Sequence, residues 1–239
     1  MEYYRITGLT VAMDTFGRTL EQAKPYRCEP VENPDMVIEA MWETCKDKAL
    51  EKYPNMDADV GEYLYTGAKF YKELLTFGGM MLHSSAVVVD GKAYLFSADP
   101  GTGKSTHTKL WLEKFGDRAY ILNDDKPALR LEKGQWMAYG TPWSGKHDIS
   151  VNTGVPLAGI AMIERGEENE IHPHGGTVAL RELLAQVNRP KGAEYRILLL
   201  ELLDKLVTQV PIWKLRCNMT PAAAEVAYDA MKQLNYGSH

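Results

Sequence analysis

The alternation of apolar and polar residues predicts a β-hairpin near the middle of the chain. Residues 84–98, SSAVVVDGKAYLFSA, hold two apolar runs on either side of Asp90-Gly91. Both positions of this dipeptide tolerate a positive φ, which a tight type I′ turn requires. The second strand leads directly into a glycine-rich segment, DPGTGKST. A hairpin at this point favours a mixed sheet over an all-parallel one.

Apolar residues at helical spacing predict helices on both sides of that hairpin. In residues 57–77 they fall near one face, with Asp57 or Asp59 available as a cap and Gly78-Gly79 as an end. The last helix is expected to start with Thr220 as N-cap and Pro221 in its first turn. That last helix is expected to cover residues 220–236, and further helices are expected within residues 105–116, 177–187 and 193–207. Further strands are expected within residues 3–13, 118–125, 127–140 (a hairpin around Lys133-Gly134), 156–174 (a buried strand, a charged turn and a return strand) and 210–218.

The pattern divides the chain into two parts. Residues 1–57 form a small N-terminal section with a strand-like start and a turn-rich polar stretch. Residues 36–53 begin like a strand and end like a loop or short helix. Residues 58–239 are expected to form the catalytic domain. The expected fold class is α/β: a mixed sheet with a P-loop, plus a small β-containing N-terminal section.

Composition and charge exclude several classes of function. The net charge of −5 argues against nucleic acid as a partner, because basic surfaces hold phosphate backbones. The most apolar run, ILLLELLDKLV, is interrupted by Glu201, Asp204 and Lys205, so no membrane span is expected. The first ten residues carry an early acid and no apolar run, unlike a secretory signal. We therefore expect a cytoplasmic protein.

Cysteine and histidine spacing does not suggest a metal centre. Cys28, Cys45 and Cys217 have no paired spacing, which favours free thiols in a reducing compartment. His172 and His174 lack an accompanying acid or cysteine pattern, so an exposed loop is the simpler interpretation. The leucine-rich residues 194–208 are expected to be core or a subunit interface, so a homo-oligomer is one possibility.

The segment DPGTGKST is the main chemical signal. Gly101 and Gly103 let successive backbone N–H groups point at phosphate oxygens, and the following helix directs its positive end at the same anion. Lys104 can reach the β- and γ-phosphates, and the Ser105 hydroxyl can bind Mg²⁺. The first glycine of the usual motif is replaced by Ala98. The residues expected to bind nucleotide are Pro100, Gly101, Thr102, Gly103, Lys104, Ser105, Thr106 and Lys146.

Two adjacent acids follow the next apolar strand, about twenty residues after Lys104. We expect Asp124 to hold Mg²⁺ together with Ser105, and Asp125 to accept the proton of an incoming hydroxyl. A solvated turn is the alternative interpretation of such a pair.

Two further residues are candidates on position alone. His83 precedes the hairpin and can lie near the γ-phosphate as a hydrogen-bond donor or proton shuttle; it can also simply cap a strand end. Lys146, in TPWSGKHD, is either a second phosphate-binding cation or part of a surface turn. The expected catalytic residues are therefore Asp125, His83 and Lys104.

These residues, in this order, resemble the HPr kinase/phosphorylase catalytic domain and its related serine kinases, which share a fold with phosphoenolpyruvate carboxykinases. The resemblance runs from about His83 to Tyr228. It implies that Lys104 and Ser105 bind ATP and Mg²⁺, and that Asp124 lies near the metal. It also implies that Asp125 acts as base toward a serine, with His83 beside the reacting phosphate.

The segment after the acids separates this chain from the longer HPr kinases. Those carry R-G-x-G-I-I-D, whereas this chain reads GTPWSGKHDISV and has a much shorter N-terminal section. It is more similar to the shorter HPr kinase-related proteins, some of which resemble kinases that modify peptides. The expected function is an ATP- and Mg²⁺-dependent kinase acting on a protein or peptide serine. A nucleotide-binding regulatory protein with little catalysis and a small-molecule kinase remain the alternatives.

Overall fold

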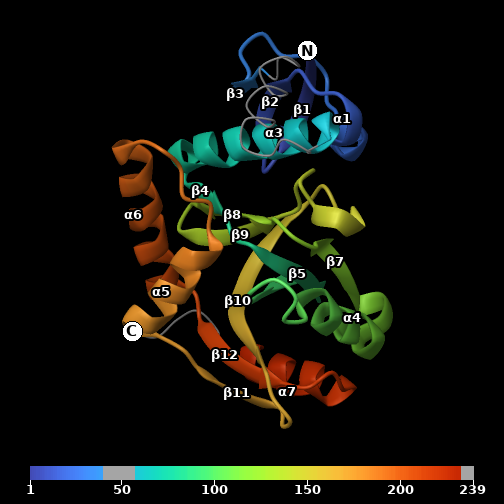
Figure 1. The fold of residues 1–239 in the computed structure, drawn as a ribbon, viewed down its shortest axis with the longest axis vertical. Helices are drawn as coiled ribbons and strands as arrows, with labels where there is room; N and C mark the ends of the chain where they lie inside the picture. Colours follow the sequence, from blue (N-terminus) through green and yellow to red (C-terminus); the bar gives the residue numbers. More distant parts are fainter. Residues whose placement is uncertain (40–56, 233–239) are drawn as a thin grey trace.

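The computed structural model describes residues 1–39 and 57–232 (Figure 1). The predicted loop or short helix after residue 39, and Cys45, lie outside the described residues. Among those described, Cys28 and Cys217 are free thiols. None of the described helices combines the length and apolarity needed to cross a bilayer.

The chain forms two sheets and six α-helices within the described residues. The small N-terminal sheet contains β1 (Glu2–Ile6), β2 (Leu9–Met13) and β3 (Met36–Ile38). The large sheet contains β4 (Gly79–Met81), β5 (Ser84–Val89), β6 (Lys92–Ser97), β7 (Ala119–Asn123), β8 (Ala128–Glu132), β9 (Gln135–Tyr139), β10 (Gly154–Arg165), β11 (Glu170–Pro173) and β12 (Ile212–Cys217). The helices are α1 (Gly17–Ala23), α3 (Ala58–Leu74), α4 (Lys104–Phe115), α5 (Gly176–Gln186), α6 (Ala193–Gln209) and α7 (Pro221–Met231).

The large sheet is mixed, as the sequence predicts. The long strand β10 runs parallel to β6 and β12, and its first residues pair antiparallel with β9. The hairpin β5–β6 turns at Asp90 and Gly91, whose φ angles of 50° and 76° suit the predicted turn. The predicted fold class, a mixed α/β sheet with a small N-terminal β-section, is confirmed.

Helices cover both faces of the large sheet (Figure 1). Apolar residues of α5 and α6 pack with one face, and those of α4 and α7 pack with the other. A third apolar cluster joins the N-terminal sheet to α3, which lies between that sheet and the large one. Helix α3 thus completes the N-terminal core; the predicted domain division at residue 57 stays a prediction.

One local prediction is wrong in detail. Residues 3–13 form a hairpin, not one strand, because Thr7 and Gly8 turn the chain with φ of 54° and 79°. The predicted return strand is present as β11, and it pairs with β12 because β12 already occupies that edge of β10. Thr220 and Pro221 are at the predicted start of α7, although the Thr220 hydroxyl bonds Asn218 and caps no helix amide.

Candidate functional site

Four segments meet at one edge of the large sheet. Strand β5 pairs antiparallel with β6 and β7, so its start at Ser84 lies beside their ends. The antiparallel pairing therefore brings His83, the glycine loop (residues 98–103) and the acids after β7 together. Residues 144–147 form the fourth segment. They surround a cavity of about 620 Å³ lined by His83, Pro100, Gly101, Gly103, Lys104, Ser105, Thr106, Lys109, Asp124, Asp125, Ser144, Lys146 and His147.

The glycine loop ends at the N-terminus of α4. Gly101 and Gly103 have φ of 78° and 124°, which favours glycine at both positions. The N-cap Gly103 supplies no capping side chain, and the first turn contains no acid. The first amides of a helix have no acceptor within the helix, and they mark the positive end of its dipole. This end of α4 is therefore suited to an anion in the cavity.

Ala98, where the usual motif has glycine, is a buried residue at the end of β6. It is 4% exposed and packs in an apolar cluster with Phe96 and Leu110. Among the described residues, positive φ outside glycine occurs at Thr7, Asp90, Lys133 and Asp148. Ala98 therefore has a conformation open to any residue, and this loop does not need a glycine there.

The ammonium of Lys104 closes the glycine loop. Its Nζ donates to the carbonyl oxygen of Ala98 over 2.8 Å. Burial lowers the pKa of Lys104, although nearby Asp125, Asp99 and Asp124 act in the opposite direction. Lys104 thus holds the loop in shape and stands at the cavity wall as a potential phosphate ligand.

Asp125 lies between the imidazole of His83 and the ammonium of Lys126. Its Oδ1 is 3.2 Å from Nε2 of His83, and its Oδ2 is 2.9 Å from Nζ of Lys126. Burial raises the pKa of Asp125, but the His83 hydrogen bond and the Lys126 charge outweigh it and bring the pKa to about 2. At neutral pH Asp125 is an ionised acceptor of low basicity.

A chain of hydrogen bonds orients His83. Gln186, the last residue of α5, donates from Nε2 to Asp99 over 3.2 Å, which turns its Oε1 toward the imidazole. That oxygen is 3.1 Å from Nδ1 of His83, while Nε2 faces Asp125. Both ring nitrogens therefore face oxygen atoms, and each of them can donate a hydrogen bond when it carries a proton. His83 thus directs a donor into the cavity.

The second acid, Asp124, is held on both sides. Its Oδ1 accepts a 2.6 Å hydrogen bond from Ser85, whose hydroxyl is 3.1 Å from that of Thr108 on α4. Its Oδ2 is 2.6 Å from Nδ1 of His147. Asp124 is only 8% exposed. Each carboxylate oxygen of Asp124 has one such neighbour and keeps a lone pair for a further ligand.

The loop with Lys146 and His147 packs directly on Asp125. Gly145 has a φ of 75°, and a Cβ there would lie 2.6 Å from Cβ of Asp125. Its amide donates to the Tyr63 hydroxyl over 2.9 Å, and Arg18 donates to its carbonyl oxygen. Glycine at this position allows the loop to place Lys146 and His147 in the cavity wall.

The structure brings together every predicted site residue except one. Thr102 faces neighbouring cavities on the other side of the loop, where Arg165 donates to its carbonyl oxygen. Sequence reasoning assigned no role to several residues in or beside the cavity. Lys126 directly follows the acids, and Lys109 lies one helical turn after Ser105, so spacing could have indicated both. Those missed are Ser85, Lys109, Lys126 and Gln186, whereas Ser144 and His147 belong to the loop TPWSGKHD that the sequence indicates without giving either residue a role.

The described residues contain no cluster of three or more His, Cys, Asp or Glu side chains arranged for a metal ion. The sequence suggests that His172 and His174 are exposed loop residues; His172 is exposed but lies in β11, and His174 lies in the loop after β11 but is partly buried. Their Nε2 atoms are 3.7 Å from Glu170 and 3.3 Å from Glu182.

Comparisons with known proteins do not assign the chain to a family. No family model matches it, and no curated protein matches it. Among solved structures it is similar to the Hpr(Ser) kinase/phosphatase from Coxiella burnetii, at 10% sequence identity and a TM-score of 0.39. The similarity covers 64% of this chain and 97% of that one. A likeness this low supports no conclusion about this chain, so residue roles depend on the side chains described above.

Proposed function

We propose that the chain is an ATP- and Mg²⁺-dependent kinase that transfers the γ-phosphoryl group to a hydroxyl, with a protein or peptide serine as the first candidate acceptor. One observation carries the proposal. The uncapped N-terminus of α4, the ammonium of Lys104 and the Asp125–His83 pair all face a single cavity of about 620 Å³. That combination serves phosphate binding and hydroxyl orientation at once.

The residues present fit a triphosphate. A Cβ added at Gly101 would meet nothing within 4 Å, so the backbone there is open to a ligand. The first-turn amides of α4 and the ammonium groups of Lys104, Lys109 and Lys146 supply donors and positive charge. Phosphate oxygens need both of these features.

The residues also fit Mg²⁺, provided that the nucleotide supplies part of its shell. Ser105 and Asp124 line the cavity and offer the oxygen ligands this hard cation prefers. Mg²⁺ usually binds through one or two carboxylates, water and substrate phosphates, so a full protein cage is unnecessary. When bound, it would neutralise charge on the phosphates.

In the proposed transfer, the acceptor oxygen forms a bond to the γ-phosphorus as the bond from that phosphorus to the bridging oxygen breaks. ADP leaves with the electron pair of the broken bond. The hydroxyl proton passes to Asp125 as the new bond forms. A loose transition state requires little base strength, so the main role of Asp125 is to orient the hydroxyl. His83 and Lys126 keep Asp125 ionised for that role.

A second candidate is a nucleotide-binding regulatory protein with little catalysis. The observation in its favour is the low basicity of Asp125, whose pKa is held at about 2. A small-molecule acceptor is a variant of the first proposal.

The Asp125→Asn variant tests the proposal. We expect Mg-ATP affinity to stay within about three-fold and transfer to serine peptides and small alcohols to fall by about 10²- to 10⁴-fold, as removal of a positioned base does. Affinity is measured by calorimetry and transfer with γ-labelled ATP. Asp117→Asn, an exposed surface change, is the control. Transfer at the wild-type rate in Asp125→Asn would contradict the base assignment. Tight nucleotide binding without transfer or hydrolysis in the wild-type protein would favour the regulatory candidate.

A further inference from the structure

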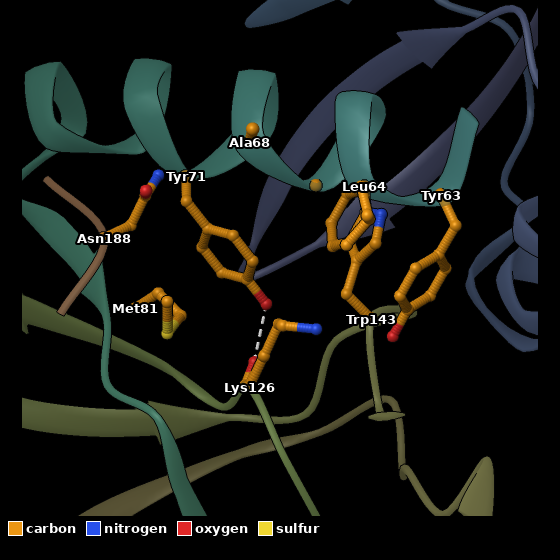
Figure 2. Close-up of a pocket in the computed structure, with 9 residues that line it drawn as sticks. Tyr63, Leu64, Ala68, Tyr71, Met81, Lys126, Trp143 and Asn188 are labelled. Atoms are coloured by element: carbon orange, nitrogen blue, oxygen red, sulfur yellow. Dashed lines mark hydrogen bonds between the residues drawn. The ribbon is translucent and has the colours of Figure 1, made fainter. Parts of the chain in front are cut away.

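A second cavity lies against α3, beside Trp143 and Lys126 (Figure 2). It has a volume of about 170 Å³ and is lined chiefly by aromatic and apolar groups. Dry apolar cavities of about 150 Å³ hold a benzene ring. This cavity is therefore large enough for one six-membered ring or one branched aliphatic side chain.

Aromatic side chains dominate its wall. Trp143 is fully buried and stacks on Phe70, with ring centroids 4.8 Å apart, so its position is fixed by the core behind it. Tyr71 is fixed from the other side, because its hydroxyl donates to the Lys126 carbonyl over 2.5 Å (Figure 2). Leu64 and Ala68, at the exposed edge of α3, form part of the rim. The cavity is thus preformed and has an opening to solvent.

Lys126 connects this cavity to Asp125. The side chain of Lys126 lines the cavity, and its ammonium lies 2.9 Å from Asp125 and 5.1 Å from the centre of the Tyr63 ring. The Tyr63 hydroxyl in turn accepts from Gly145, which packs on Asp125. A group seated among these rings is therefore next to the carboxylate that would orient the reacting hydroxyl.

We propose that this cavity binds an aromatic or branched apolar group of the phosphate acceptor, beside the hydroxyl that reacts at Asp125. The inference rests on the proposed kinase function for the identity of the ligand, but the cavity itself can be tested without phosphoryl transfer. The apolar group would come either from a side chain near the acceptor serine or from a small hydroxylated molecule.

Binding of two probes in the absence of ATP tests the inference. The probes are 2-phenylethanol and short blocked peptides with one serine and a phenylalanine one to three residues away; 1-propanol and all-alanine peptides are the ring-free counterparts. Affinities are measured by ligand-observed NMR on the full chain. We compare wild type with Ala68→Phe, which obstructs the rim, and Lys69→Phe, which adds the same ring one position along α3 and outside the cavity.

We expect the ring-bearing probes to bind wild type and Lys69→Phe at least five-fold more tightly than their ring-free counterparts, and this preference to disappear in Ala68→Phe. Additional affinity of a phenylalanine peptide over 2-phenylethanol would identify a peptide as the source of the ring. Equal binding of ring-bearing and ring-free probes, or a preference that survives in Ala68→Phe, would overturn the inference. Failure of transfer in the wild-type protein would count against the kinase proposal and leave these binding results intact.

Discussion

Lys104 shows how one side chain serves both the loop and its proposed ligand. Its ammonium is partly buried at the N-terminus of α4, and its hydrogen bond to the Ala98 carbonyl keeps it at the cavity wall. A lysine held in this way can exchange a neutral acceptor for a phosphate oxygen with little reorganisation. Hydrogen bonds to charged groups are also stronger than those to neutral ones.

Replacing Lys104 with methionine should therefore weaken Mg-ATP binding by roughly 10- to 100-fold, the value of one hydrogen bond to a charged group. The change keeps an unbranched side chain of similar length and removes the charge. Calorimetric titration measures the effect, with Lys92→Met at the exposed start of β6 as control. Equal ATP affinity in wild type and Lys104→Met would show that this lysine does not contact phosphate.

For individual residues, the sequence predicts which side chains come together in the site but not which of them contact one another. Lys104, Ser105 and the two acids are recognisable because they follow strands at known offsets. The contact of His147 with Asp124 and that of Gln186 with His83 join residues 23 and 103 positions apart. Neither pairing leaves a local pattern, so only the folded chain reveals these partners.

The contact between α1 and α3 contains a buried carboxyl group. Glu62 is fully buried and accepts a hydrogen bond from the Thr19 hydroxyl; its Oε1 has no hydrogen-bond partner within the described structure. Burial raises the pKa of Glu62 from 4.5 to about 7, partly offset by the Thr19 hydrogen bond. The protonated form is therefore favoured in the folded state.

Glu62 makes the free energy of unfolding depend on pH. Between about pH 4.5 and 7 the folded protein keeps a proton that the unfolded chain releases, so stability falls as the pH rises through that window. Glu62→Gln should remove this dependence and be more stable than wild type at pH 8, by an amount on the order of 2 kcal/mol. Urea denaturation at pH 5 and pH 8 measures it, with Glu113→Gln on the exposed face of α4 as control. A wild-type pH dependence retained in Glu62→Gln would contradict the assignment.

Helices and strands that are marked by turn residues or by regular apolar spacing in the sequence are predicted well. The hairpins at Asp90-Gly91 and Lys133-Gly134 and the helix after Asp57 follow from turn chemistry and spacing, and all three are confirmed. The turn at Thr7-Gly8 was missed because threonine is β-branched and rarely adopts a positive φ. Strand β11 pairs with β12 because the edge of β12 is free, and no pattern within the sequence of β11 indicates this partner.

Across the whole molecule, the N-terminal section supports the candidate site. Arg18 of α1 donates to the Gly145 carbonyl oxygen, forms a 2.6 Å ion pair with Asp148, and lies 4.6 Å from the centre of the Tyr63 ring. The Arg18–Gly145 contact joins residues 127 positions apart. The sequence predicts a separate N-terminal section but gives no sign that it holds the loop bearing Lys146 and His147.

Removing the Arg18 side chain should loosen that loop. In Arg18→Ala we expect backbone amides of residues 144–148 to exchange hydrogen about ten-fold faster or more, the effect of losing about 1.4 kcal/mol of local stability. Transfer should fall, and Mg-ATP affinity should fall less than in Lys104→Met, because the glycine loop is untouched and only the loop with Lys146 is loosened. Hydrogen exchange read by mass spectrometry tests this against Arg5→Ala, an exposed change in the small sheet. Unaltered exchange at residues 144–148 would show that the N-terminal section does not hold the loop.

The central claim is that the cavity between the glycine loop and Asp125 holds the phosphates of ATP. The most direct measurement is a crystal structure of the chain with Mg²⁺ and a non-hydrolysable ATP analogue. We predict the triphosphate against Gly101–Ser105 with Lys104 in contact, and the terminal phosphate facing Asp125 and His83. A nucleotide bound elsewhere, or one whose terminal phosphate points away from Asp125, would contradict the proposal.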